Sequence, residues 1–288
     1  IMKGIILAGG LGTRLMPLTQ IKNKHSFLIY DKPMIFYPLS ILMLMNIREI
    51  LIISDKKTVV DYKKLLGNGK DLGIRILYKT QNKPKGIVEA FKIGNSFLKN
   101  SKKNVLILGD NFFYGSDLQN VFPSVLDKNQ GCSIFLCPVK NPYAFGNDIF
   151  NKKNKIINLK EKMKNNKNNL AITGLYFFDE QVVKFAKKVS FSKRGELEIT
   201  DLLKLYLKQK KINYKILGRG YLWYDMGTIE SINEVNNIVE NIQNRQGTAV
   251  GNIHEVSYLK KFINKNKLKS LIQNYNSPYF DYIKQKYF

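Results

Sequence analysis

The sequence predicts an α/β protein with a Rossmann-like, mostly parallel sheet flanked by helices, and three observations support this prediction. Short apolar runs, typical of buried strands, alternate with amphipathic segments through the first 110 residues. Glycines or polar residues follow these runs directly, as expected where the strands of a parallel sheet end. The chain has 288 residues, 44% of them hydrophobic, which is enough for a large buried core.

The N-terminal part is predicted to contain four strands with a helix between each successive pair. Each predicted strand is short, apolar and closed by glycine or a polar residue, and the second helix ends in glycines. The strands are expected at 3–9, 48–54, 74–80 and 104–110, and the helices at 33–47, 57–69 and 86–98. Ligands of such sheets bind at the carboxyl ends of the strands, so loops at those ends are the first candidates for a site.

The second half is less regular. Further strands are expected at 132–139 and 171–179, and a loop or exposed hairpin at 151–169. A loop entering a helix is expected at 193–209, and a strand running into a glycine turn at 213–227. Helices are expected from residue 229 onward. We predict one structural unit, with an α/β core at 1–228 and a helical C-terminal region at 229–288 that packs on the core.

The composition argues against several classes of protein. The formal net charge of +25 suggests nucleic-acid binding, but the lysines are scattered, only six residues are Arg, and no aromatic-interleaved basic motif occurs. We therefore expect solvated surface lysines that attract phosphate-bearing ligands, and no nucleic-acid partner. Two cysteines and two histidines predict neither a disulfide framework nor a zinc site. No signal segment or spanning run is evident, so we expect a cytoplasmic protein without a membrane partner.

A glycine-rich loop follows the first predicted strand and could hold phosphate. Gly9 and Gly10 allow backbone N–H groups to face an anion, and Thr13 and Arg14 add a hydroxyl and a guanidinium. The loop fits neither the Walker pattern, because no Lys-Ser/Thr pair follows, nor the G-x-G-x-x-G fingerprint, because Leu15 occupies the third glycine position. From the loop alone, a phosphate site and a plain tight turn both stay open.

Asp110 ends an apolar strand, where a carboxylate can hold Mg²⁺ or simply cap a turn. The glycine loop and Asp110 fit a larger pattern that resembles the sugar-phosphate nucleotidyltransferases. In one branch, the glucose-1-phosphate thymidylyltransferases, the resemblance extends over residues 2–250. The matching segments are GLGTRLMPLT at 10–19, Lys24, YDKPMIFYPLSILML at 30–44, GDNFFYG at 109–115, Glu161-Lys162, TGLYFFD at 173–179, RGELEIT at 194–200, LGRGYLWYDMGT at 217–228 and NRQG at 244–247.

The resemblance implies an activity and a set of site residues. The phosphate of glucose 1-phosphate would attack the α-phosphorus of dTTP, giving dTDP-glucose and pyrophosphate, with Mg²⁺ held by Asp110 and Asp225. The implied catalytic residues are Arg14, Lys24, Lys162 and Asp110. The implied nucleotide-binding residues are Leu7, Gly9, Gly10, Gly12, Thr13, Arg14, Gln81 and Gly86. Sugar-binding insertions would contribute Gly146, Glu161, Lys162, Thr173 and Tyr176.

The resemblance also assigns individual roles. Arg14 would bind the β- and γ-phosphates, Lys24 the α-phosphate, and Lys162 the phosphate of the sugar. Members of this family are typically homotetramers, so self-association is expected. The product would feed the synthesis of dTDP-rhamnose or a related deoxysugar of the cell envelope.

The chain departs from the family pattern at positions close to these residues, and the functional alternatives therefore stay open. The departures are His25, Leu28, Asn147-Asp148, Met163 and Met226. They remove no charged group that the chemistry needs, although a displaced group would slow the reaction. Besides dTTP-dependent transfer, a related transferase with another nucleotide or sugar and a non-catalytic sugar-nucleotide-binding homologue remain to be tested.

Overall fold

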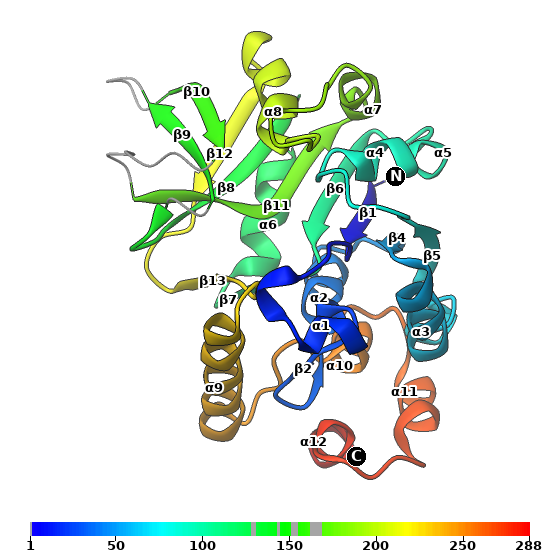
Figure 1. Cartoon of the computed structure of the whole chain (residues 1–288). Helices are drawn as coiled ribbons and strands as arrows, with labels where there is room; N and C mark the ends of the chain where they lie inside the picture. The colour runs from blue at the N-terminus through cyan, green and yellow to red at the C-terminus, as the bar shows by residue number, and fades with distance from the viewer. Residues whose placement is uncertain (1, 128–130, 143–144, 151–154, 162–168) are drawn as a thin grey trace.

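A computed structural model describes residues 2–127, 131–142, 145–150, 155–161 and 169–288 (Figure 1). Within these residues the main sheet has seven strands in the order β12-β8-β11-β6-β1-β4-β5. Strand β11 pairs antiparallel with both neighbours, whereas the other pairings in the sheet are parallel. The prediction of a mostly parallel sheet is confirmed. The strands are β1 (Met2–Leu7), β4 (Glu49–Ser54), β5 (Arg75–Thr80), β6 (Lys103–Leu108), β8 (Cys132–Pro138), β11 (Leu170–Asp179) and β12 (Ile212–Ile216).

Helices cover both faces of the sheet because successive strand residues point to opposite sides. In β1, Ile6 packs in the cluster that includes α2, α3 and α6, whereas Ile5 packs in the cluster of α4, α5, α7 and α8. The sheet is therefore apolar on both faces, which is why its strands read as continuous hydrophobic runs. The helices are α2 (Phe36–Leu44), α3 (Lys56–Leu66), α4 (Glu89–Ile93), α5 (Asn95–Leu98), α6 (Leu118–Asp127), α7 (Val182–Ala186) and α8 (Ile199–Lys208).

Three two-stranded ribbons and a short helix, α1 (Leu18–Ile21), complete the core. They are β2 (Leu28–Ile29) with β3 (Lys32–Pro33), β7 (Asn111–Gly115) with β13 (Tyr221–Asp225), and β9 (Gly146–Phe150) with β10 (Ile156–Glu161). The β9–β10 pair is antiparallel, so the described part of 151–169 agrees with the hairpin alternative. The β7–β13 pair is also antiparallel and sets Asp225 opposite Asn111. This ribbon joins Asn111, in the middle of the chain, to Asp225 near the end of the α/β core.

Three predicted elements differ in detail from the observed ones. The helix expected at 86–98 is split at Gly94 into α4 and α5, where a Cβ would lie 2.9 Å from Ile5 Cδ1 of the sheet. The helix expected from Pro33 begins at Phe36, because Lys32–Pro33 forms β3. The single strand expected at 213–227 is two strands in two different sheets, β12 and β13.

The C-terminal region is helical, as expected, and contacts the core. Its helices are α9 (Ile229–Gln246), α10 (Ile253–Leu259), α11 (Lys265–Ile272) and α12 (Pro278–Tyr287), which gather at the lower end of the molecule in Figure 1. Thr228 caps α9 and accepts from Ser231 N at 3.2 Å. Helix α10 packs on α2 through Ile253 and Val256. No helix in the described part of the chain is long and apolar enough to cross a membrane.

Candidate active site

The glycine loop begins where β1 ends and is folded around a buried leucine. Gly10 and Gly12 have φ angles of 119° and 58°, which favour glycine, and the chain then forms a 3-10 turn at Thr13–Leu15. Leu15 is fully buried, so it holds the turn on the core while Arg14 stays exposed. The guanidinium of Arg14 reaches toward Gly227. A Cβ built on Gly227 would lie 3.7 Å from Arg14 Nη2. The loop therefore presents Arg14 beside Asp225.

Lys24, Asp110 and Asp225 meet at the carboxyl end of the sheet. The Lys24 ammonium forms an ion pair with Asp110 Oδ2. Met226 N donates to Asp110 O at 2.8 Å, which holds the end of β13 against the residue that precedes β7. Asp225 Oδ1 is buried without a hydrogen-bond partner. An orphaned carboxylate oxygen beside a second carboxylate is costly unless a cation or donor joins them.

The charges of this cluster shift the ionisation of its members. Burial raises the pKa of Asp225, and repulsion by Asp110 raises it further, to about 7. Burial would by itself raise the pKa of Asp110, but the nearby Lys24 ammonium and the hydrogen bonds from Lys24 and Asn111, together with the other surrounding groups, hold it well below its usual range. Burial opposes the charge of Lys24, yet Asp110 and Asp225 together raise its pKa above the usual value. The ion pair of Lys24 with Asp110 is therefore fully charged at neutral pH, whereas the Asp225 carboxyl is only partly ionised at that pH.

The departures from the family pattern do not remove this cluster. His25 is buried against Gly109, and its Nδ1 lies 2.6 Å from Asn23 Oδ1. Burial and the neighbouring Lys24 charge lower the pKa of His25 to about 3, so it is neutral. Leu28 is 65% exposed, and Met226 is fully buried in the apolar cluster behind the site. Met163 lies outside the described residues, and the backbone of Asn147-Asp148 lies in β9.

Gln81, one of the nucleotide-binding residues that the resemblance implies, lies directly beside the glycine loop. Gln81 is 6% exposed, and its Oε1 occupies space that a Cβ on Gly9 would need. Gly86 has a φ of 101°, and a Cβ there would lie 2.5 Å from the carbonyl oxygen of Leu197. Leu7 is buried beneath the loop at the end of β1. Gln81 and Gly9 are thus neighbours in space although they are far apart in sequence, whereas Gly86 packs against Leu197.

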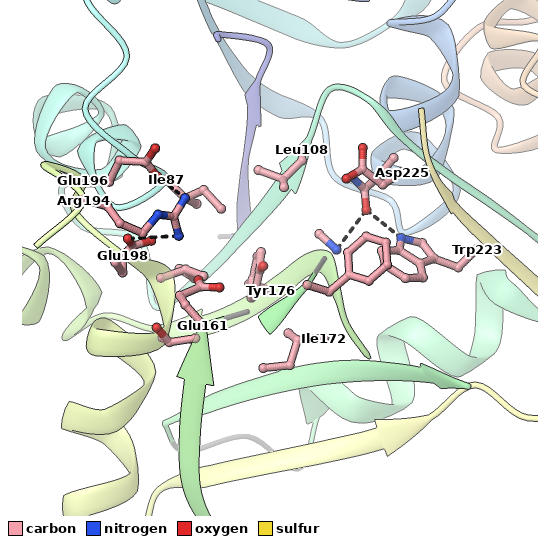
Figure 2. Close-up of a pocket in the computed structure, with 15 residues that line it drawn as sticks. Ile87, Leu108, Glu161, Ile172, Tyr176, Arg194, Glu196, Glu198, Trp223 and Asp225 are labelled. Atoms are coloured by element: carbon pink, nitrogen blue, oxygen red, sulfur yellow. Dashed lines mark hydrogen bonds and ion pairs between the residues drawn. The ribbon is translucent and has the colours of Figure 1, made fainter. Parts of the chain in front are cut away.

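A cavity of about 190 Å³ is lined on one side by Asp225 and includes two of the five predicted sugar-binding residues in its walls (Figure 2). Glu161 and Tyr176 line it, and Gly146 pairs with Glu161 across the β9–β10 ribbon. Burial raises the pKa of Tyr176 far above its usual value, so its phenol remains protonated and able to donate. Lys162 lies outside the described residues. The cavity has the size of a single sugar ring and has Asp225 in its wall.

Thr173 is not among the residues that line the cavity. Its hydroxyl is buried without a partner, in a bulge where the pairing of β11 with β8 jumps from Ile172 to Tyr176. The bulge frees the N–H of Gly174 from β8, and this N–H donates instead to Asn111 Oδ1 at 2.9 Å. Thr173 therefore lies in the irregular part of the strand that bounds the cavity.

Asn111, Trp223 and Arg194 line the cavity, but none of them received an individual role from the sequence. Asn111 Oδ1 also accepts from Trp223 Nε1 at 2.6 Å, and Asn111 Nδ2 donates to Asp110 Oδ1 at 3.1 Å, so one amide joins β7, β11, β13 and the carboxylate. Arg194 pairs with Glu198 at 3.4 Å on the opposite wall in Figure 2. Their segments are part of the family pattern, and the scarcity of arginine in this lysine-rich chain is a signal that would have singled out Arg194.

Comparisons with known proteins identify the family to which the chain belongs. The model of the nucleotidyl transferase family matches residues 3–242, so the chain belongs to that family. Curated glucose-1-phosphate thymidylyltransferases of Neisseria meningitidis and Mycolicibacterium smegmatis are 44% and 40% identical to it, over 271 and 267 residues. These alignments cover 94% and 93% of this chain, and 93% and 92% of the respective relatives.

Solved structures share the fold. A Bacillus anthracis structure assigned as a glucose-1-phosphate thymidylyltransferase, in complex with sucrose, is 36% identical with a TM-score of 0.76. That alignment covers 83% of this chain and 95% of the other. A UDP-glucose pyrophosphorylase complexed with UDP-glucose has a TM-score of 0.72 at 23% identity, covering 84% and 99% of the two chains, and shares the fold alone.

Proposed function

We propose that this protein transfers a thymidylyl group from dTTP to α-D-glucose 1-phosphate, giving dTDP-glucose and pyrophosphate. The observation that carries the proposal is the meeting of Lys24, Asp110 and the orphaned Asp225 oxygen beside a cavity of one sugar ring's size. The similarity to curated glucose-1-phosphate thymidylyltransferases over more than nine-tenths of the chain supports the choice of nucleotide and sugar.

The transfer requires alignment and charge neutralisation, and no covalent enzyme intermediate. A phosphate oxygen of glucose 1-phosphate forms a bond to the α-phosphorus of dTTP, and the bond between that phosphorus and the bridging oxygen of pyrophosphate breaks. Lys24 neutralises charge on the α-phosphate, and Arg14 holds the departing pyrophosphate. Gly9, Gly10, Gly12 and Thr13 offer backbone and hydroxyl groups to the phosphates, while Gln81 and Gly86 hold the base.

A divalent cation fits the carboxylate pair. Asp225 Oδ1 is a buried acceptor without a donor, and hard oxygen ligands suit Mg²⁺, which completes its shell with substrate phosphates and water. We assign Asp110 and Asp225 as its protein ligands. When bound, the ion supplies charge neutralisation at the triphosphate. No cluster of three or more His, Cys, Asp or Glu occurs in the part of the chain that the structure describes.

The sugar is held by the cavity beside this cluster. Glu161 accepts from sugar hydroxyls, Tyr176 and the Gly146 backbone flank the ring, and Lys162 binds the sugar phosphate. Thr173 lies in the bulge of β11 beside the cavity. A cytoplasmic location, a homotetrameric assembly and the division into 1–228 and 229–288 as one unit stay predictions, and light scattering of the purified protein tests the assembly.

Pyrophosphate release tests the proposal. The protein is incubated with Mg²⁺, glucose 1-phosphate and each nucleoside triphosphate in turn, and release is expected with dTTP, with a smaller signal from dUTP or UTP. Release only with another nucleotide would point to a related transferase. Silence with every nucleotide would point to a non-catalytic homologue. Asp110→Asn should abolish release while the protein stays folded, and an active variant would overturn the metal assignment.

A further inference from the structure

Glu89, at the first position of α4, is bound to the residue that we place at the base. Glu89 Oε2 accepts from Gln81 Nε2 at 2.5 Å and from the backbone N–H of Lys85 at 3.2 Å. Gln81 is nearly buried and Glu89 is half-buried, so this contact is shielded from solvent. A hydrogen bond to a charged acceptor in such a place is stronger than one between neutral groups.

This contact decides which way the Gln81 amide faces. The amide nitrogen lies toward the Glu89 carboxylate, and the amide oxygen lies over Gly9 in the glycine loop. The backbone of Gln81 is fixed independently, because Gln81 N donates to Ser54 O at 2.8 Å. If the amide turned over, its oxygen would face the carboxylate oxygen and leave two acceptors opposed without a proton between them.

The orientation of this amide matters for base recognition. Gln presents one acceptor and one donor side by side, which complement the N3–H and O4 of thymine. Cytosine carries the reverse pattern, an acceptor at N3 and a donor at N4. An amide free to turn over would serve either pyrimidine, whereas an amide held in one orientation favours one of them.

We propose that Glu89 is a specificity-determining residue that locks the Gln81 amide, so that the site accepts thymine and uracil and rejects cytosine. The inference rests on the proposed function, since it takes Gln81 as the residue that meets the base. Glu89 acts through Gln81 and does not touch the substrate itself. Because thymine and uracil share the same edge, the lock does not distinguish them.

A purely structural role for Glu89 predicts a different result. Its contact with Lys85 N also orders the loop that leads to Gly86, so removing Glu89 could weaken every nucleotide alike. The lock instead predicts a change in the ratio of kcat/KM for dTTP to that for dCTP, with the ratio of dTTP to dUTP unchanged. The two ratios measured on one variant separate the two roles.

The test compares three variants of the full chain with the wild type. Glu89→Leu keeps the bulk and removes the acceptor, Glu89→Gln keeps an acceptor, and Glu240→Ala is a control at an exposed position of α9. Pyrophosphate release is measured with dTTP, dUTP and dCTP in the presence of glucose 1-phosphate and Mg²⁺. Binding of dTTP and dCTP is measured in parallel by calorimetry.

The expected result is a fall of about tenfold or more in the dTTP-to-dCTP ratio for Glu89→Leu, the effect of one charge-assisted hydrogen bond. Glu240→Ala should stay close to the wild type, whereas Glu89→Gln, which can still accept from Lys85 N but carries no charge, should lower the ratio less than Glu89→Leu does. A folded, active Glu89→Leu enzyme with the wild-type ratio would overturn the lock and leave the proposed function standing. If Glu89→Leu does not fold, Glu89→Asp shortens the reach of the carboxylate and should lower the same ratio.

The proposed function can fail separately. Wild-type protein that releases pyrophosphate from no nucleotide contradicts the transfer, and the calorimetric ratio then judges the lock alone. A wild type that binds dTTP no more tightly than dCTP would overturn the lock. A preference for dTTP that Glu89→Leu removes would support it.

Discussion

Replacing Asp225 with Asn should stabilise the metal-free protein at neutral and alkaline pH. The pKa of this carboxyl is raised from 3.8 to about 7 by burial and by Asp110. A carboxyl whose pKa is raised in the folded state contributes stability that is present below its unfolded pKa and lost as the pH rises through the folded pKa. The ionised side chain therefore opposes folding above about pH 7, and the neutral amide does not.

The size of the effect follows from the shift. About three pKa units at 1.36 kcal/mol each correspond to roughly 4 kcal/mol. Even half of that energy should move the Tm by about 4–8 °C in a chain of this size. The difference in Tm between Asp225→Asn and the wild type should grow from about pH 4 to pH 7 and level off above, because only the wild type titrates there.

The assay is thermal unfolding in the presence of EDTA at pH 4, 6 and 8, with Asp61→Asn as a control at an exposed position of α3. Adding Mg²⁺ and dTTP at pH 8 should raise the Tm of the wild type and have little effect on Asp225→Asn. A variant that melts at or below the wild-type temperature at pH 8 without metal would refute the reasoning, since Asp225 would then have a favourable partner.

Three further predictions follow from the same contacts. Lys24→Met leaves Asp110 buried without its cation, so it should abolish turnover and lower the free energy of unfolding by about 3–5 kcal/mol in urea titrations; wild-type stability would contradict the pairing. Burial lowers the pKa of His254 to about 4, so the free energy of unfolding should fall as the pH drops below 6.5, by up to about 1.4 kcal/mol per pH unit. His254→Asn should flatten this fall in urea titrations across pH 4–7. Trp223 is the single tryptophan and lines the cavity that we propose for the sugar, so glucose 1-phosphate should change the protein's tryptophan fluorescence. A Trp223→Phe variant that still shows the change would place the sugar elsewhere.

The sequence predicted the sheet well because each strand is buried on both faces. Ile5 and Ile6 pack on opposite sides of β1, so the strand is a continuous apolar run that stops at glycine. Helix boundaries were less predictable. Gly94 divides α4 from α5 because the backbone there packs against Ile5, and such close packing is not visible in local sequence.

The sequence predicted the charged residues of the candidate site but not the hydrogen bonds that connect its strands and loops. Arg14, Lys24, Asp110 and Asp225 were named from motifs, and the structure brings them together. Asn111 was not assigned a role, because its importance comes from joining three strands that are distant in the chain. The Glu89 contact with Gln81 was also missed, since it depends on how the loop between β5 and α4 folds back.

Oxygen labelling of glucose 1-phosphate tests the central claim most directly. The protein is incubated with unlabelled dTTP, Mg²⁺ and glucose 1-phosphate that carries ¹⁸O in its phosphate. The masses of the products are then measured by mass spectrometry. Attack of the sugar phosphate on the α-phosphorus predicts that the label remains in dTDP-glucose and that the pyrophosphate is unlabelled. Formation of dTDP with a doubly phosphorylated glucose, or label in pyrophosphate, would contradict the account.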